Sequence, residues 1–268
     1  MIALLLLFVA SDAPAKGAPP VENAWSVLDY GVVDNSADRR SQAVHALAIL
    51  EGNVHAGKLA EHALKDSNAD VRAEAANTLG RMHATSAVPL LKQALNDHEV
   101  NVVLSAAGAL YELKDPAAYD VYYAVLTGQQ KSTQGLLASQ LAMLKSRKEM
   151  ERLAIETGIG FIPFGSLGYQ AWKTITRDNS SLVKAAAALR LASDPDSKSG
   201  QALAAACKDD SWQVRAAAAQ AIAKRGDTTL MHNLTPLLND PTDAVRYESA
   251  ASLIWLSQHP RKPRGLRH

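Results

Sequence analysis

The feature that most constrains the fold of this chain is a nine-residue pattern that recurs 31 positions later. VRAEAANTL begins at Val71 and VVLSAAGAL at Val102, while VRAAAAQAI and VRYESAASL begin at Val214 and Val245. In each copy two small residues stand side by side and a large aliphatic residue follows three positions after them. Small side chains let helices approach closely, so the pattern predicts helices that stack on their equivalents in the next repeat.

A second set of positions shows where the turns fall. Leu64 and Leu95 are 31 residues apart, as are Cys207 and Leu238, and an aspartate follows each of them two positions later. The repeat unit is therefore a first helix (helix A), a short turn, a second helix (helix B), and an Asp-bearing turn into the next unit. One such pair cannot bury its apolar face alone, whereas stacked pairs can, so we expect an all-α, right-handed α-solenoid.

The run from the Asp-bearing turn through Val-Arg-x-x-Ala-Ala-x-x-Leu to AVPLL at 87–91 resembles HEAT repeats. The similarity is to the short type found in phycobilisome-lyase-like proteins, and it covers most of residues 37–257. It implies a solenoid of HEAT-type helical hairpins. It implies much less about function, because such repeats serve as scaffolds, adaptors and a few enzymes.

The N-terminus carries a nine-residue apolar run, Ile2–Ala10, followed by Ala13-Pro14-Ala15. The run is too short to span a bilayer but has the length and small-residue flank of a secretory signal peptide. We therefore expect an exported protein, periplasmic or extracellular; a buried first helix in a cytosolic adaptor is the alternative. The expected segments are a signal peptide (1–15), a spacer and N-terminal capping segment (16–36), HEAT repeats (37–157 and 179–257), an apolar Gly-rich insertion (158–178) and a basic disordered tail (258–268).

The insertion stands out because GIGFIPFGSLGYQAW, residues 158–172, carries no charge and contains Phe161 and Phe164. Its glycines do not match G-x-G-x-x-G, which argues against a phosphate-binding loop. We interpret the segment as a plug over an exposed apolar edge between two half-solenoids, with Trp25 and Tyr30 in an N-terminal cap and Trp255 closing the other end. The alternatives are that the insertion contacts a partner protein or that it contacts a membrane.

No residue set predicts catalysis, a cofactor or a metal site. Cys207 falls in the leucine column and is expected to be buried, and His55 with His62 supply too few ligands for a metal. The HEAT-repeat iron enzyme deoxyhypusine hydroxylase has several His-Glu pairs, whereas this chain has one, His98-Glu99. The recurring Asp and Arg residues are expected to cap turns and to link neighbouring repeats, because they follow the repeat instead of converging.

Charge argues against a nucleic-acid surface. The expected leader holds one of the 27 acidic residues and the expected tail four of the 28 basic ones, which leaves 24 basic residues against 26 acidic ones. A nucleic-acid-binding surface needs a clear basic excess, so nucleic acid is not an expected partner.

Binding of another protein on the concave face is the function that remains, and we expect helices B to line that face. Tyr123 aligns with Lys92 at a solvent-facing position of the repeat, whereas Tyr119 and Tyr122 align with core positions. The candidate partner-binding residues are Tyr123, Lys92, Phe161 and Phe164. The expected function is a non-enzymatic, protein-binding adaptor or scaffold of the bacterial cell envelope; the resemblance also implies, as an alternative, a tetrapyrrole-chromophore lyase or lyase chaperone.

Overall fold

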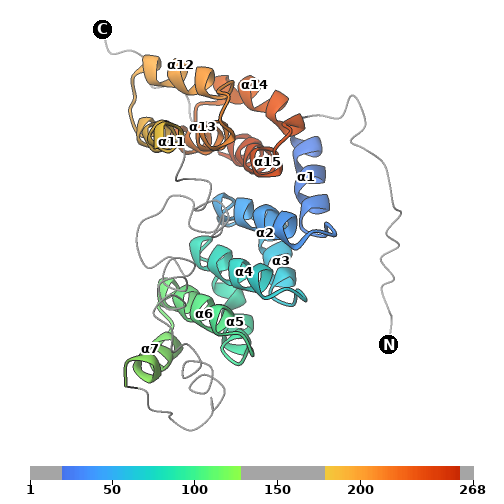
Figure 1. The fold of residues 1–268 in the computed structure, drawn as a ribbon, viewed down its shortest axis with the longest axis vertical. Coiled ribbons are helices and arrows are strands. Elements are labelled where there is room, and N and C mark those ends of the chain that lie inside the picture. Colours follow the sequence, from blue (N-terminus) through green and yellow to red (C-terminus); the bar gives the residue numbers. More distant parts are fainter. Residues whose placement is uncertain (1–19, 128–178, 260–268) are drawn as a thin grey trace.

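The computed structural model describes residues 20–127 and 179–259, and these two ranges contain helices and no β-strand (Figure 1). The N-terminal half consists of α1 (Pro20–Gly31), α2 (Ala37–Ala46), η1 (Leu47–Ile49), α3 (Val54–Ala63), α4 (Ala69–Arg81), η2 (Thr85–Ala87), α5 (Val88–Ala94), α6 (Val100–Glu112) and α7 (Ala117–Thr127). The C-terminal half consists of α11 (Asn179–Leu191), α12 (Ser197–Ala206), α13 (Trp212–Arg225), η3 (Thr228–Leu230), α14 (Met231–Leu234), η4 (Thr235–Asn239) and α15 (Asp243–Gln258). The prediction of an all-α helical solenoid is confirmed.

The small-residue pairs of the repeat lie where the sequence predicts them. Ala75 with Ala76 and Ala106 with Ala107 are fully buried between neighbouring helices A, and the large residue three positions later, such as Leu79, fills the core beside them. Turn residues begin the helices: the side chain of Asn68 accepts hydrogen bonds from two backbone N–H groups of the first turn of α4. The predicted alternation of close helix contact and Asp- or Asn-bearing turns is therefore present.

The helices stack in an order that differs from their order in the chain. Helices A pack in the sequence α11, α13, α15, α2, α4, α6, so the last helix of the C-terminal half packs directly on the second helix of the N-terminal half (Figure 1). Helix α1 packs on α15 and touches η4 on one side, and its Trp25 and Asp29 contact His55 of α3 on the other. Helix α1 therefore occupies the helix B position beside α15, and one central repeat is built from the two ends of the described chain.

This arrangement corrects the predicted caps. Trp25 and Tyr30 lie on α1 and Trp255 lies on α15, and both helices are inside the stack and not at its ends. The ends of the described stack are α7 and α11. Sequence periodicity could not show this, because a repeat pattern identifies equivalent helices but not which of them become neighbours.

Several predicted segments lie outside the described residues. They are the signal peptide, the 158–178 insertion with Phe161 and Phe164, and all but the first residues of the basic tail. Within the described ranges, no helix is both long enough and apolar enough to cross a membrane.

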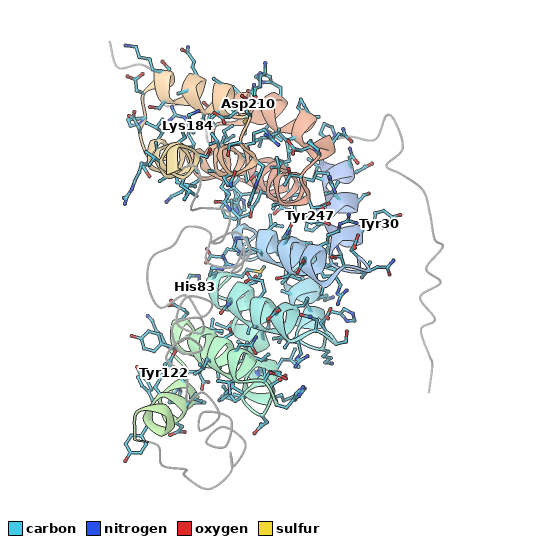
Figure 2. All side chains as sticks on the ribbon, viewed as in Figure 1. Tyr30, His83, Tyr122, Lys184, Asp210 and Tyr247 are labelled. Carbon is cyan, nitrogen blue, oxygen red and sulfur yellow. The ribbon has the colours of Figure 1, made fainter. Side chains whose placement is uncertain are left out.

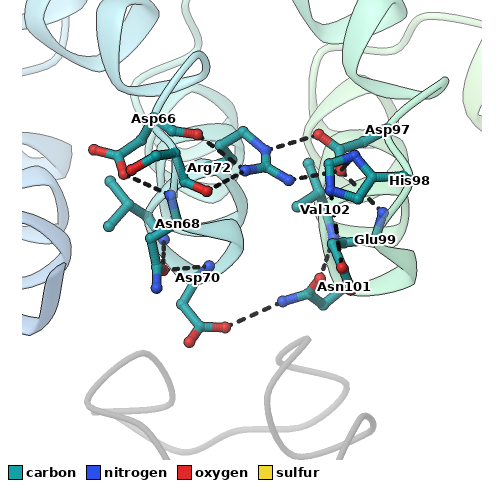
Figure 3. Close-up of polar contacts among 11 residues, drawn as sticks. Asp66, Asn68, Asp70, Arg72, Asp97, His98, Glu99, Asn101 and Val102 are labelled. Atoms are coloured by element: carbon teal, nitrogen blue, oxygen red, sulfur yellow. Dashed lines mark hydrogen bonds and ion pairs between the residues drawn. The ribbon is translucent and has the colours of Figure 1, made fainter.

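The predicted ladder between Asp and Arg residues is present and joins consecutive repeats (Figure 3). The Arg72 guanidinium donates two hydrogen bonds of 2.8 Å to the carboxylate of Asp97 in the next repeat and a third, of 2.9 Å, to the backbone carbonyl of Asp66. Equivalent bidentate pairs link Arg40 with Asp66, at 2.7 and 2.8 Å, and Arg215 with Asp240, at 2.7 and 2.9 Å. Each arginine thus contacts the backbone carbonyl of the aspartate in its own repeat, whereas the carboxylate of that aspartate, as in Asp66, accepts from the arginine of the preceding repeat.

The junction between the two halves uses a different pair. Arg39 of α2 donates from Nε to Asp243 of α15 at 3.1 Å and lies 3.4 Å from Asp34 in the turn before α2. Arg246, which holds the ladder position in α15, is paired instead with Asp243 of its own helix. Arg39 therefore replaces the regular ladder contact where the chain order is interrupted.

The ladder predicts acid sensitivity. Burial raises the pKa of the Asp97 carboxyl, but hydrogen bonds from the Arg72 side chain and the Glu99 backbone lower it by more, so the pKa lies below its usual value. A depressed folded-state pKa stabilises the protein above the unfolded pKa of about 3.9, and this stabilisation is lost as the pH falls through the folded-state pKa. We expect Asp97→Asn to lower the free energy of unfolding by about 1–3 kcal/mol at pH 7 and by less at pH 3. Urea unfolding at both pH values measures this, with the exposed Asp210→Asn as control; equal losses at the two pH values would contradict it.

Two helical glycines provide a matched test of the helix packing. A Cβ added at Gly80 of α4 would lie 2.8 Å from the backbone Cα of Ala109 in α6, whereas one added at Gly57 of α3 would meet nothing within 4 Å. We expect Gly80→Ala to destabilise the fold by about 1–3 kcal/mol, because two backbones must move apart. Gly57→Ala should stabilise it by up to about 1 kcal/mol through helix propensity. Chemical denaturation followed by circular dichroism compares them, and a stabilising Gly80→Ala would refute the close α4–α6 contact.

Candidate functional site

The structure forms an open cavity of about 980 Å³ at the angle between the two halves. Its lining comes from α2 with η1 and from α4 of the N-terminal half, and from α11, α13 and α15 of the C-terminal half. Every lining residue belongs to a helix A or to the residues directly after one. In Figure 1 the helices A of the C-terminal half face the N-terminal half, with α12 and α14 behind them. The inner face is therefore made by helices A, which corrects the expectation that helices B line it.

A buried polar cluster forms part of the cavity wall. His45 of α2 lies at its centre, with Nδ1 2.8 Å from Oε1 of Glu74 in α4 and Nε2 3.7 Å from Oε1 of Glu248 in α15. Arg81 of α4 donates from a terminal nitrogen to the same Glu74 oxygen at 2.7 Å. The hydroxyl of Thr78 donates to the backbone carbonyl of Val44 at 3.1 Å. One histidine thus stands between carboxylates that belong to opposite halves of the molecule.

The two glutamates of this cluster differ in how well they are paired. Both are buried, Glu74 at 5% and Glu248 at 7% exposure. Burial raises the pKa of Glu74, but the charge and hydrogen bond of His45, followed by the charge of Arg81, lower it by more, so the carboxyl is held ionised. Glu248 has no hydrogen bond to any described residue, and its ion-pair contact is His45 at 3.7 Å.

Several metal-ligating and nucleophilic side chains of residues 20–127 and 179–259 lie outside this cluster. Among the described residues no three His, Cys, Asp or Glu side chains are placed to hold a metal ion. Cys207 is buried as predicted, and burial raises the pKa of its thiol to about 11, so at neutral pH it is not a thiolate. His55 hydrogen-bonds Asp29 of α1 at 2.8 Å and serves the packing of α1 on α3.

Two of the predicted partner-binding residues, Tyr123 and Lys92, belong to the described part of the chain. Tyr123, on α7, is 46% exposed, in agreement with the predicted solvent-facing position. Lys92 of α5 pairs with Asp115 at 2.9 Å. Neither residue lines the cavity.

Two tyrosine predictions were wrong. Tyr119 and Tyr122 were expected in the core but are 61% and 39% exposed, and Figure 2 shows Tyr122 on α7. Their rings meet Tyr111 edge to face at centroid distances of 6.0 and 6.2 Å, respectively. Their repeat positions are covered elsewhere by the following repeat. Among the described helices, α7 packs closely on α6 and has no following repeat against it.

Comparison with protein families agrees with this architecture. The family model for HEAT repeats matches residues 56–141 and 170–254, which together are more than half of the chain. The chain belongs to the HEAT repeat family. Among solved structures, a human deoxyhypusine hydroxylase in complex with glycerol is similar, with 19% identity over 89% of this chain and 97% of that one and a TM-score of 0.34. That likeness is too low to support an inference of shared function, and no curated protein matches the sequence.

The cavity cluster of this HEAT solenoid was missed in the sequence. Its members come from different repeats, and each looked like part of the helical pattern. One signal was present: Glu74 and Glu248 hold the same fourth position of the nine-residue pattern, where the other two clear copies have Ser105 and Ala217. A charged residue at a position that packs against the neighbouring helix A indicates a buried polar contact.

Proposed function

We propose that this protein is a non-enzymatic, protein-binding scaffold that holds a segment of its partner in the cavity between the two halves. The observation that carries the proposal is that five helices A, from both halves, line one open space of about 980 Å³. Concave surfaces of helical solenoids are suited to extended partners, and a space of this size accepts several side chains.

The lining fits a protein ligand in its chemistry. Apolar side chains such as Ile49, Leu189 and Trp255 alternate with charged ones such as Arg81 and Glu248. Mixed apolar and charged walls are typical of surfaces that bind protein, where aromatic and arginine side chains supply most of the affinity. We place the protein in the cell envelope, as the apolar run Ile2–Ala10 and the small residues after it suggest.

Site-specific photo-crosslinking tests the proposal. A photoreactive lysine analogue is placed at Lys224, which lines the cavity, or at the exposed Lys58 of α3, which does not, and each variant is mixed with a cell-envelope extract of the native host. We expect one discrete adduct at position 224 and none at position 58. The cavity-filling Ala48→Trp should reduce that adduct roughly tenfold while the protein stays folded.

Two results of this experiment would contradict the proposal. Equal capture at positions 224 and 58, or an adduct that Ala48→Trp leaves unchanged, would show that the cavity is not the binding surface.

A further inference from the structure

The strongest unexplained feature of the cavity is the buried carboxylate of Glu248. Its side chain is 10% exposed and lines the cavity, yet it receives no hydrogen bond from any described residue. Its contact with His45 Nε2, at 3.7 Å, is beyond hydrogen-bond length. A mostly buried carboxylate that no described residue donates to is costly, so a donor that enters the cavity gains more there than it would in water.

The positive groups of the cavity do not fill this role. Arg81 forms an ion pair with Glu74, and the Arg81 side chain is 43% exposed. Lys224 is exposed to solvent. These two cationic side chains therefore lie toward water, whereas Glu248 is a buried lining carboxylate to which no described residue donates a hydrogen bond.

An aromatic surface lies next to this carboxylate. Trp255 also lines the cavity and follows Glu248 by seven residues on α15, which places it on the same helical face about 10 Å away. Its ring stacks on His259 at a centroid distance of 3.7 Å, and the residue remains partly exposed. A long side chain with a planar charged head can lay its stem along such a ring and reach the carboxylate with its head.

We propose that Glu248 and Trp255 form a recognition site for an arginine side chain of the partner protein, with the guanidinium hydrogen-bonded to Glu248. A guanidinium is planar, carries five donors and pairs with a carboxylate through two parallel hydrogen bonds. This inference rests on the proposed function, because it names the group by which a bound segment is held.

A small probe tests the site directly. N-acetylargininamide carries a guanidinium but neither a free amine nor a free carboxylate, and N-acetylcitrullinamide is its neutral, nearly isosteric control. Each is titrated into the full chain while the indole N–H resonance of Trp255, assigned with Trp255→Phe, is followed by NMR. We expect a saturable shift with the arginine derivative and none with the citrulline derivative.

Variants of the two cavity carboxylates provide the matched controls. Glu248→Gln should lower the affinity for the arginine derivative at least tenfold, because a charge-assisted pair of hydrogen bonds is lost. Glu51→Gln removes a carboxylate that is 57% exposed and contacts His83 at 3.3 Å, and it should change affinity less than twofold. Thermal unfolding by circular dichroism should show Glu248→Gln folded and no less stable than the wild type, because no hydrogen bond with a described residue is removed.

The results separate this inference from the proposed function. Equal binding of the two derivatives, no saturable binding, or unchanged affinity in Glu248→Gln overturns the arginine site. If the Lys224 adduct still forms and survives Glu248→Gln, the scaffold function stands and the arginine site is lost. If neither adduct nor probe binding is found, both are overturned.

Discussion

Replacing Glu74 with alanine is expected to lower the free energy of unfolding by about 3 kcal/mol. Glu74 is the buried carboxylate that accepts from Arg81 and contacts His45, so its removal leaves two positive or polar groups without their acceptor. The helix propensity of alanine offsets only part of this loss. Denaturant unfolding at pH 7 measures the change.

Two further variants define what the loss means. Glu74→Gln keeps one hydrogen-bond acceptor, so it should lower the free energy of unfolding by less than Glu74→Ala does. Glu112→Ala, at an exposed position near the end of α6, should change stability by no more than about 0.5 kcal/mol. A loss below about 1 kcal/mol in Glu74→Ala would show that the contacts of Glu74 do not stabilise the packing of α4 on α2.

The pH dependence of the Glu74 contribution has a definite sign. The pKa of Glu74 is lowered in the folded state, because the opposing effect of burial is outweighed by His45 and Arg81. Its stabilising contribution is therefore complete above the unfolded pKa of about 4.3 and is lost as the pH falls through the folded-state value. The difference between wild type and Glu74→Ala should accordingly shrink in acid.

Truncation of Leu28 is expected to destabilise a helix more than 200 residues away in the chain. Leu28 is fully buried in the hydrophobic core and lies on α1, the helix that packs on α15. Leu28→Ala should cost about 2–5 kcal/mol through lost burial and the cavity it leaves. Because each repeat of a solenoid contacts its neighbours only, the effect should be local in space.

Hydrogen exchange distinguishes the stacking order observed here from a stack in chain order. Faster exchange in Leu28→Ala is expected in α1, α15 and α2, and little change in α6, which lies two helices A beyond α2. Ala73→Gly, in α4, is the control, and it should leave the hydrogen-exchange rates of α15 unchanged. Increased exchange restricted to α1 and α2 would contradict the pairing of α1 with α15.

The sequence was most informative where the structure repeats. Spacing alone located the helices, the buried alanine pairs, the Asp-bearing turns and the burial of Cys207, because each depends on contacts that recur every 31 residues. It was wrong for Tyr119 and Tyr122, where a repeat has no successor among the described helices. It could not show the cavity, because His45 and Glu248 are brought together by the contact of α2 with α15, which no periodic pattern encodes.

The shared central repeat affects how the chain is made as well as how it is held. Helix α1 is the first of the described helices to be synthesised, but α15, on which it packs, follows only after more than 200 further residues. The Arg39–Asp243 pair between α2 and α15 likewise spans 204 positions. At about 5–20 residues per second the ribosome needs on the order of 10–40 s to reach α15. During that interval the apolar face of α1 has no native neighbour in α15. The contact between α1 and α15 can therefore form only after almost all of the described chain has been synthesised.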